Sequence, residues 1–324
     1  MRYLSALVSG LLCTATACWA PARAQAPGAA YGPIYTSLDS ALAAPQGSVQ
    51  RLHLSAAGLD SLPARLLGLA PSLRFLVLSH NRLDSLPAWM GRLRALEVLA
   101  VNGNRLRALP ASLAQLTALR QLDAAHNRLA ELPAGLGALP RLERLSLAAN
   151  PLTHIPQDLA GAPALRELDL SGLAVADYEQ LGDVLIHQPH LRVLHLRGYL
   201  PPGAPRPVGA AYVPRQLARM DSLEALHLDG APLDNPAADF LVLGRAPRLR
   251  LLSMAGTGLR LVPSNMGGYK RLEELRLDRN GLYMLPPELR KLRALRRLSL
   301  TGNAFHESEQ ARVRLLLPQA EVAF

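Results

Sequence analysis

Apolar residues recur along most of the chain with a period of 23 residues. The stretch 73–95, LRFLVLSHNRLDSLPAWMGRLRA, shows the unit, with apolar side chains at its positions 1, 4, 6, 11, 14, 18 and 21. The same spacing restarts at Leu96, Leu119 and Leu142. A unit of about 20 to 50 residues repeated in tandem predicts a solenoid, because each unit can bury its apolar side only against its neighbours.

Eleven units of this kind fill residues 49–306, and three of them, within 165–248, are longer than the others. They begin at Val49, Leu73, Leu96, Leu119, Leu142, Leu165, Leu191, Leu223, Leu249, Leu272 and Leu295. The LxxLxL half of each unit predicts a short strand of a parallel sheet on the concave side. The LPxxLxxL half predicts a turn or short helix that returns along the convex side. The expected fold is therefore an α/β solenoid.

The full unit, LxxLxLxxNxLxxLPxxLxxLxx, resembles the leucine-rich repeat family, in the subclass with an LPxxL second half. The match extends over about five-sixths of the chain. It implies a horseshoe-shaped fold, and the flanking segments are similar to those of exported bacterial members. The resemblance implies a fold and a binding surface, but it implies no reaction.

The ninth position of the unit predicts an internal ladder of amides. It is asparagine in six repeats: Asn81, Asn104, Asn127, Asn150, Asn280 and Asn303. A buried amide both donates and accepts, so stacked asparagines can satisfy the backbone groups of the loops that they turn. The middle repeats carry Leu173, Tyr199, Ala231 and Thr257 there instead.

Repeat length changes in the same region, to 26, 32 and 26 residues from Leu165 onward. In the two repeats of 26 residues we expect true convex helices. One would be capped by Asp177 and the other would begin at Asn235 with Pro236 in its first turn. The extra residues at 200–212 are rich in Pro and Gly, which predicts a surface loop that either carries function or is a neutral insertion.

Residues 1–24 are typical of a secretory signal peptide, with Arg2 followed by a short apolar stretch and an Ala-Arg-Ala site before Gln25. We expect cleavage after Ala24 and an exported protein, periplasmic or secreted. Lipid attachment at Cys18 is the alternative. Cys13 and Cys18 are the only cysteines. The mature chain would therefore have no disulfide, thiolate zinc site or cysteine nucleophile.

The segments beside the repeats are expected to cover their ends. Residues 25–48 predict a flexible lead up to residue 34 and a short cap helix that begins after Thr36 or Ser37. Residues 307–324 predict a C-terminal cap, with an amphipathic helix over 307–317 and an edge strand over 321–324.

The formal charge of +10 comes almost entirely from arginine, because Lys270 and Lys291 are the only lysines. An excess of positive charge favours nucleic acids, anionic membranes or acidic proteins as binding partners. The chain has no basic run or nucleic-acid motif, so no nucleic-acid partner is expected. It also lacks a transmembrane stretch and any phosphate-loop, dinucleotide or metalloprotease motif, so we expect no cofactor and no enzyme activity.

The second position of successive repeats alternates in charge, as in Arg74, Glu97, Arg120 and Glu143. Neighbouring strands place these side chains in contact, so they predict a structural ladder of ion pairs.

The third and fifth positions face outward from the concave sheet, where a partner can reach them. They begin with an apolar patch, expected to be exposed, and continue as a polar strip. These candidate contact residues are Phe75, Val77, Val98, Gln121, Asp123, Arg144, Glu167, Asp169, His195 and His227. Ala100 belongs to the patch, and a covering lead segment is its alternative explanation. Asp169, His195 and His227 share one row, for which we favour a polar ladder over a metal site.

Arg82, Arg105 and Arg128 occupy the tenth position of consecutive repeats and form a basic rim. The rim suits an anionic ligand, although a solvated edge would have the same sequence.

These patterns indicate a protein-interaction scaffold that binds a macromolecule on its concave face. Binding of an envelope glycan or other anionic polymer by the arginine rim is the alternative. A ubiquitin-ligase effector with a repeat domain is disfavoured, because no segment is left for a catalytic domain and the mature chain would lack the required cysteine.

Overall fold

The computed structural model describes residues 31–173, 178–198, 214–231, 233, 235–264 and 268–324. Four expectations lie outside these residues: the signal peptide 1–24, the lipid site at Cys18, the Asp177 cap and the insertion 200–212.

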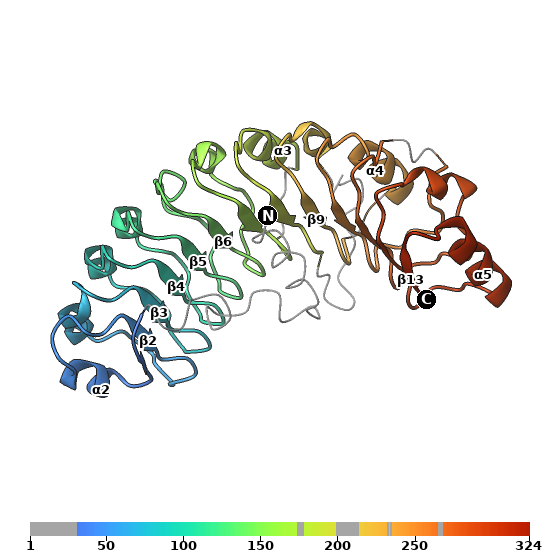
Figure 1. Cartoon of the computed structure of the whole chain (residues 1–324). Helices are drawn as coiled ribbons and strands as arrows, with labels where there is room; N and C mark the ends of the chain where they lie inside the picture. The colour runs from blue at the N-terminus through green and yellow to red at the C-terminus, as the bar shows by residue number, and fades with distance from the viewer. Residues whose placement is uncertain (1–30, 174–177, 199–213, 232, 234, 265–267) are drawn as a thin grey trace.

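One parallel sheet, in which the strands follow one another in sequence order, lines the inner face of a curved solenoid (Figure 1). Thirteen strands of the described residues form it: β1 Ile34–Tyr35, β2 Arg51–His53, β3 Phe75–Val77, β4 Val98–Ala100, β5 Gln121–Asp123, β6 Arg144–Ser146, β7 Glu167–Asp169, β8 Val193–His195, β9 Ala225–His227, β10 Leu251–Ser253, β11 Glu274–Arg276, β12 Arg297–Ser299 and β13 Glu321–Ala323. Strands β2 to β12 occupy positions 3 to 5 of the expected repeats. The predicted solenoid is therefore confirmed.

The register explains why the leucines form one continuous core. The fourth-position leucines are register partners, as in Leu76↔Leu99 and Leu99↔Leu122. Leu73, Leu76 and Leu78 are each 0% exposed, and their equivalents in later repeats are buried in the same cluster. Successive residues of a strand point to opposite faces. Burial of the fourth position therefore turns the third and fifth positions toward the concave face.

The convex side is built mainly from short 3-10 helices, each beginning after the proline of an LP or IP pair or its equivalent. They are η1 Ala64–Leu69, η2 Ala88–Arg92, η3 Ala111–Gln115, η4 Gln157–Gly161, η5 Arg215–Arg219 and η6 Pro287–Lys291. The two repeats of 26 residues carry α-helices instead, α3 Tyr178–Ile186 and α4 Pro236–Leu243. The Asn235 side chain caps α4 by accepting from the Ala238 N–H at 3.1 Å. Both predicted helices are confirmed.

The ends of the sheet differ from the expectation in one respect. Ile34 and Tyr35, expected in the lead and the cap helix, form β1 and pair with β2. The helix α2 spans Leu38–Ala43 and is capped by Ser37, whose Oγ accepts from the Ser40 N–H at 3.1 Å. At the other end, α5 Glu307–Leu316 is followed by β13, which pairs with β12.

The ninth-position asparagines join each loop to its predecessor. Asn104 donates through Nδ2 to the carbonyls of Leu78 at 3.0 Å and Val101 at 2.9 Å, and its Oδ1 accepts from the Leu83 N–H at 3.1 Å. Thr257, where asparagine is replaced, donates its hydroxyl to the Met254 carbonyl at 3.1 Å. A hydroxyl therefore keeps one of the amide's contacts where the regular ladder is interrupted.

The residue before each asparagine bends the loop. His80, Gly103 and His126 have φ values of +57°, +68° and +52°. Side chains with a Cβ rarely adopt this conformation. It persists at the two histidines because the asparagine bonds hold the loop in place.

Within the described ranges, the helices are too short or too polar for a membrane span.

Candidate ligand-binding surface on the concave sheet

The second-position row along the sheet is occupied by ion pairs, as its alternating charges predict. Arg120 lies 2.7 Å from Glu143, and the pairs Arg192–Glu224 and Arg250–Glu273 are at 3.8 and 2.5 Å. Arg74 pairs with Glu97 in the same way. Most of this row's charge is thus neutralised within the scaffold.

The apolar patch at the N-terminal end of the sheet is buried, and the expected exposure is wrong. Phe75, Val77 and Val98 are 5%, 2% and 8% exposed. The ring of Tyr31, which precedes β1, meets the Phe75 ring edge-on with centroids 4.6 Å apart. The physical reason is that residues before the first strand fold onto β3, which corresponds to the alternative of a covering lead segment.

The polar strip begins on β5 with two nearly buried side chains, Gln121 and Asp123. Asp123 accepts a hydrogen bond from the Ala125 N–H at 3.2 Å. Burial nevertheless raises the pKa of this carboxyl, the hydrogen bond from Ala125 lowers it and the negative charge of Asp169 raises it, and together they bring it to about 7. Ser146, the register partner of both aspartates, lies between them on β6. The strip thus begins with a carboxyl group that titrates near neutral pH.

Arg144 and Glu167 are register partners on β6 and β7, and both are partly exposed. They carry opposite charges at the third position, whereas Val193 and Ala225 occupy that position on β8 and β9. The charged part of the third-position row therefore ends before the two histidines.

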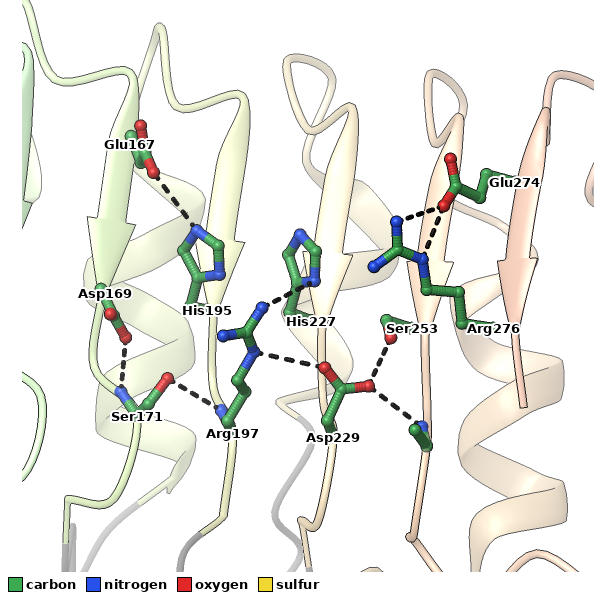
Figure 2. A network of polar contacts seen from close by, with 11 residues as sticks. Glu167, Asp169, Ser171, His195, Arg197, His227, Asp229, Ser253, Glu274 and Arg276 are labelled. Carbon is green, nitrogen blue, oxygen red and sulfur yellow. Dashed lines mark hydrogen bonds and ion pairs between the residues drawn. The ribbon is translucent and has the colours of Figure 1, made fainter. Parts of the chain in front are cut away.

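His195 and His227 form a stacked pair on β8 and β9, with ring centroids 4.5 Å apart and an interplanar angle of 15°. Glu167 Oε1 lies 3.3 Å from His195 Nε2, and an Arg197 guanidinium nitrogen lies 3.4 Å from His227 Nδ1 (Figure 2). The two rings are 4% and 0% exposed as residues. Burial first, and then the charges around it, lower the pKa of His227 well below its ordinary value.

The network continues towards the C-terminus through residues at the seventh position (Figure 2). Arg197 Nε lies 3.2 Å from Asp229, which also accepts from the Ala255 N–H at 3.0 Å and from the Ser253 hydroxyl. Further along, the Glu274 carboxylate lies between two guanidinium groups, those of Arg276 and Arg297. Two groups of hydrogen bonds and ion pairs therefore line the concave floor, one from β7 to β10 and the other on β11 and β12.

Sequence reasoning missed Arg197, Asp229, Glu274 and Arg276 as members of these two groups. Arg197 and Asp229 share an outward position of consecutive repeats and have opposite charges, which is the signal that would have found them. The third- and fifth-position alternation of Glu274 and Arg276 on one strand is a weaker signal.

Asp169, His195 and His227 share the fifth-position row, but the aspartate bonds locally. Its Oδ1 accepts from the Ser171 N–H at 3.0 Å (Figure 2). In the part of the chain that the structure describes, no group of three or more His, Cys, Asp or Glu side chains is placed to hold a metal ion.

The arginine rim lies beside the asparagine ladder. Arg82, Arg105 and Arg128 are exposed, and none of them forms an ion pair with another described residue. The rim also carries exposed Asp84 and Glu131 nearby in sequence. It is therefore an accessible row of cations with acidic groups at its side.

The chain was compared with known proteins. The family described as a leucine-rich repeat region matches residues 49–199. No curated protein matches the sequence. The internalin InlF from Listeria monocytogenes has a similar structure, with a TM-score of 0.58 and 17% identity, over 86% of this chain and 80% of the internalin.

Two complexes have similar arcs. The TLR13–ssRNA13 complex has a TM-score of 0.58 and 20% identity, over 86% of this chain and 47% of the other. The ectodomain of the plant membrane receptor kinase GASSHO1/SCHENGEN3 from Arabidopsis thaliana, in complex with Casparian strip integrity factor 2, has a TM-score of 0.51 and 23% identity, over 85% and 35% of the two chains. This chain spans half or less of either protein.

The repeat spacing, the parallel sheet, the matched region and these folds agree: the chain has a leucine-rich repeat fold, and residues 49–199 match the leucine-rich repeat family.

Proposed function

We propose that this chain is a non-enzymatic recognition protein that binds another protein on the concave floor between β5 and β9. The observation that carries the proposal is the concentration of polar side chains there, from Gln121 to His227, some of them partly exposed. Charged groups on a rigid sheet give specificity and a fast encounter with a complementary surface.

The comparison with solved structures supports ligand binding by such an arc. The plant receptor was solved with Casparian strip integrity factor 2 and the TLR13 protein with single-stranded RNA. For this chain a protein partner suits the floor better than RNA, because the strip mixes Arg144 with Glu167 and Asp169 and so lacks the uniform positive charge that a phosphate backbone requires.

The contact surface proposed is the polar strip, with Arg144 and Glu167 as the partly exposed charges that a partner meets first. Phe75, Val77 and Val98 are buried and serve the scaffold instead, with Tyr31 packed against Phe75. This division assigns recognition and scaffold stability to different strands.

The test is a charge reversal on the concave floor with a matched control on the convex side. Bacterial envelope proteins that bind the purified chain are identified, and their affinities are measured by calorimetry. For a partner that binds the concave floor, Arg144→Glu should lower the affinity by about tenfold or more, roughly 1.4 kcal/mol. Arg290→Glu, an exposed position on η6, should leave the affinity unchanged. Equal affinities for both variants would contradict the proposal.

We also propose that the protein is exported, with its signal peptide removed after Ala24. The extracellular character of several structurally similar proteins supports this proposal. Edman sequencing of the mature protein should begin at Gln25. A first residue at Cys18 that carries lipid would instead establish the lipoprotein route.

A second candidate function is the binding of an envelope glycan or other anionic polymer by the arginine rim. It is favoured by the exposure of Arg82, Arg105 and Arg128 on consecutive repeats. Retention on immobilised polygalacturonate should fall steeply between low and physiological salt, and should fall again in Arg105→Gln. Retention that is insensitive to salt and to this substitution would exclude the rim as an anion site.

A further inference from the structure

Three buried polar atoms on the concave floor have no hydrogen-bond partner: Ser146 Oγ, His195 Nδ1 and His227 Nε2. They belong to the same fifth-position row, on β6, β8 and β9, and the residues are 1%, 4% and 0% exposed. A buried polar group without a partner costs free energy, and native proteins leave few of them. Three such atoms in one row indicate a place where a ligand can form hydrogen bonds.

The neighbours of each imidazole determine which nitrogen carries its proton. Arg197 can only donate, so His227 Nδ1, 3.4 Å from the guanidinium, is the acceptor. The lowered pKa of His227 keeps this ring neutral at pH 7, so its single proton is on Nε2. The free atom of His227 is therefore an N–H donor.

The second ring has the opposite arrangement. Glu167 Oε1, 3.3 Å from His195 Nε2, accepts, so His195 donates through Nε2. In the tautomer with its one proton on Nε2, the free Nδ1 is an acceptor. Because the rings are stacked 4.5 Å apart, an unused acceptor lies beside an unused donor.

The free acceptor on His195 and the free donor on His227 determine which chemical group a ligand must present. A carboxylate or phosphate would place lone pairs against the acceptor His195 Nδ1, and an ammonium group would leave the His227 N–H unmet. A primary amide offers an N–H and a carbonyl oxygen on the same side, and so satisfies both. A sugar hydroxyl can also do so, but the third and fifth positions of β2 to β12 hold no Tyr or Trp on which a sugar ring could stack.

We propose that His195 and His227 form a recognition site for an uncharged primary amide of a polypeptide partner, the side chain of an Asn or Gln, with Ser146 two strands away in the same row. The inference rests on the proposed function, because it names the group that the protein partner presents. Val193 and Ala225 flank the rings at the third position, and apolar surface of this kind suits the carbon atoms next to an amide. The free ring nitrogens are buried next to the partly exposed side chains of Glu167 and Arg197, so a ligand reaches them when these two side chains move aside.

The test uses small probes and needs no partner. The purified, nitrogen-15-labelled protein is titrated with acetamide, acetate, methylammonium or methyl glucoside while the imidazole nitrogens are followed by NMR. We expect Nε2–H tautomers at both rings and saturable shifts with acetamide only. His227→Phe, which keeps a stacked ring, should reduce the response of His195 at least tenfold.

His154→Phe, at an exposed position, is the matched control and should respond as the original protein does. His227→Gln, which restores an N–H donor, should recover part of the response if His227→Phe is poorly folded. Equal shifts with acetate, no shift with the amide, or a stronger response to methyl glucoside would each overturn the proposal. Because affinity for the protein partner is measured separately through Arg144→Glu, a failure here would leave that result standing.

Discussion

The two halves of the concave sheet share one backbone design but differ in what their outward side chains do. On β3 and β4, Phe75, Val77 and Val98 are buried beneath the chain's own residues, with Tyr31 against Phe75. On β8 and β9, the corresponding positions hold the stacked histidines, whose free nitrogens have no partner (Figure 2). Strand register alone therefore does not decide whether an outward position binds or packs. Both sets of side chains are buried, and they differ in that the histidines carry polar atoms without partners.

The largest expected effect tests whether the N-terminal half is scaffold. Phe75→Ala should lower the free energy of unfolding by about 3–5 kcal/mol, because a buried aromatic ring is lost and a cavity remains. Val193→Ala is the matched change in the other half. It sits at the same repeat position, is partly exposed, and should cost roughly 1 kcal/mol or less. Urea denaturation measures both. Similar values for the two variants would remove the distinction between the halves.

The next effect concerns Asp123, at the border between the halves. Its folded pKa of about 7 lies above the ordinary 3.8, so the folded state holds the proton more tightly than the unfolded state. The contribution of this group to stability is therefore present at low pH and lost as pH rises from about 4 to about 7.

Asp123→Asn keeps an acceptor for the Ala125 N–H and removes the titration. The variant should match the original protein near pH 4 and exceed it by about 2–4 kcal/mol above pH 7, with 1.36 kcal/mol per pKa unit as the conversion. Denaturation curves across this pH range measure the difference, and Asp84→Asn, at an exposed position, provides the control. A constant difference between Asp123→Asn and the original protein at all pH values would show that Asp123 is not the titrating group.

A smaller effect separates the regular ladder from the interrupted one. Asn104→Ala leaves the buried Leu83 N–H without a partner and removes one of the two asparagine bonds at each of the Leu78 and Val101 carbonyls. It should destabilise the fold by about 2–3 kcal/mol. Thr257→Val removes one hydroxyl contact and should cost about 1 kcal/mol. If the threonine change proved the more costly, the irregular repeats would depend on their substitutes more than the regular repeats depend on asparagine.

The smallest effects are the couplings between charged pairs, measured by double-mutant cycles. Arg74–Glu97, where the arginine side chain is 43% exposed, should give about 0.5 kcal/mol. Arg197–Asp229, with exposures of 21% and 27% and further bonds from Ser253 and Ala255, should give roughly 1–2 kcal/mol. Raising the salt concentration should weaken the first coupling more than the second. Equal couplings would mean that the network in the C-terminal half adds nothing to its ion pairs.

Much of the fold follows from the order of residues because a repeat constrains itself. A leucine at the fourth position is useful only when the leucines of both neighbouring repeats meet it. The spacing therefore identifies β2 to β12 and the convex turns. Local signals were also sufficient for α4, where Asn235 and Pro236 mark the first turn. They were insufficient for β1, because two residues with no repeat pattern become a strand only when an open sheet edge lies beside them.

The sequence by itself determined the solenoid, the buried leucines, the second-position ion pairs and the placement of His195 beside His227, since all of these depend on a fixed period. Only the tertiary structure decided the burial of Phe75, the raised pKa of Asp123 and the unpartnered nitrogens of the histidine pair. These properties depend on how deeply each outward side chain is covered and on which neighbouring atom faces it. A repeat period specifies which residues are neighbours, but the orientation of their side chains and the exclusion of water arise only when the chain is folded.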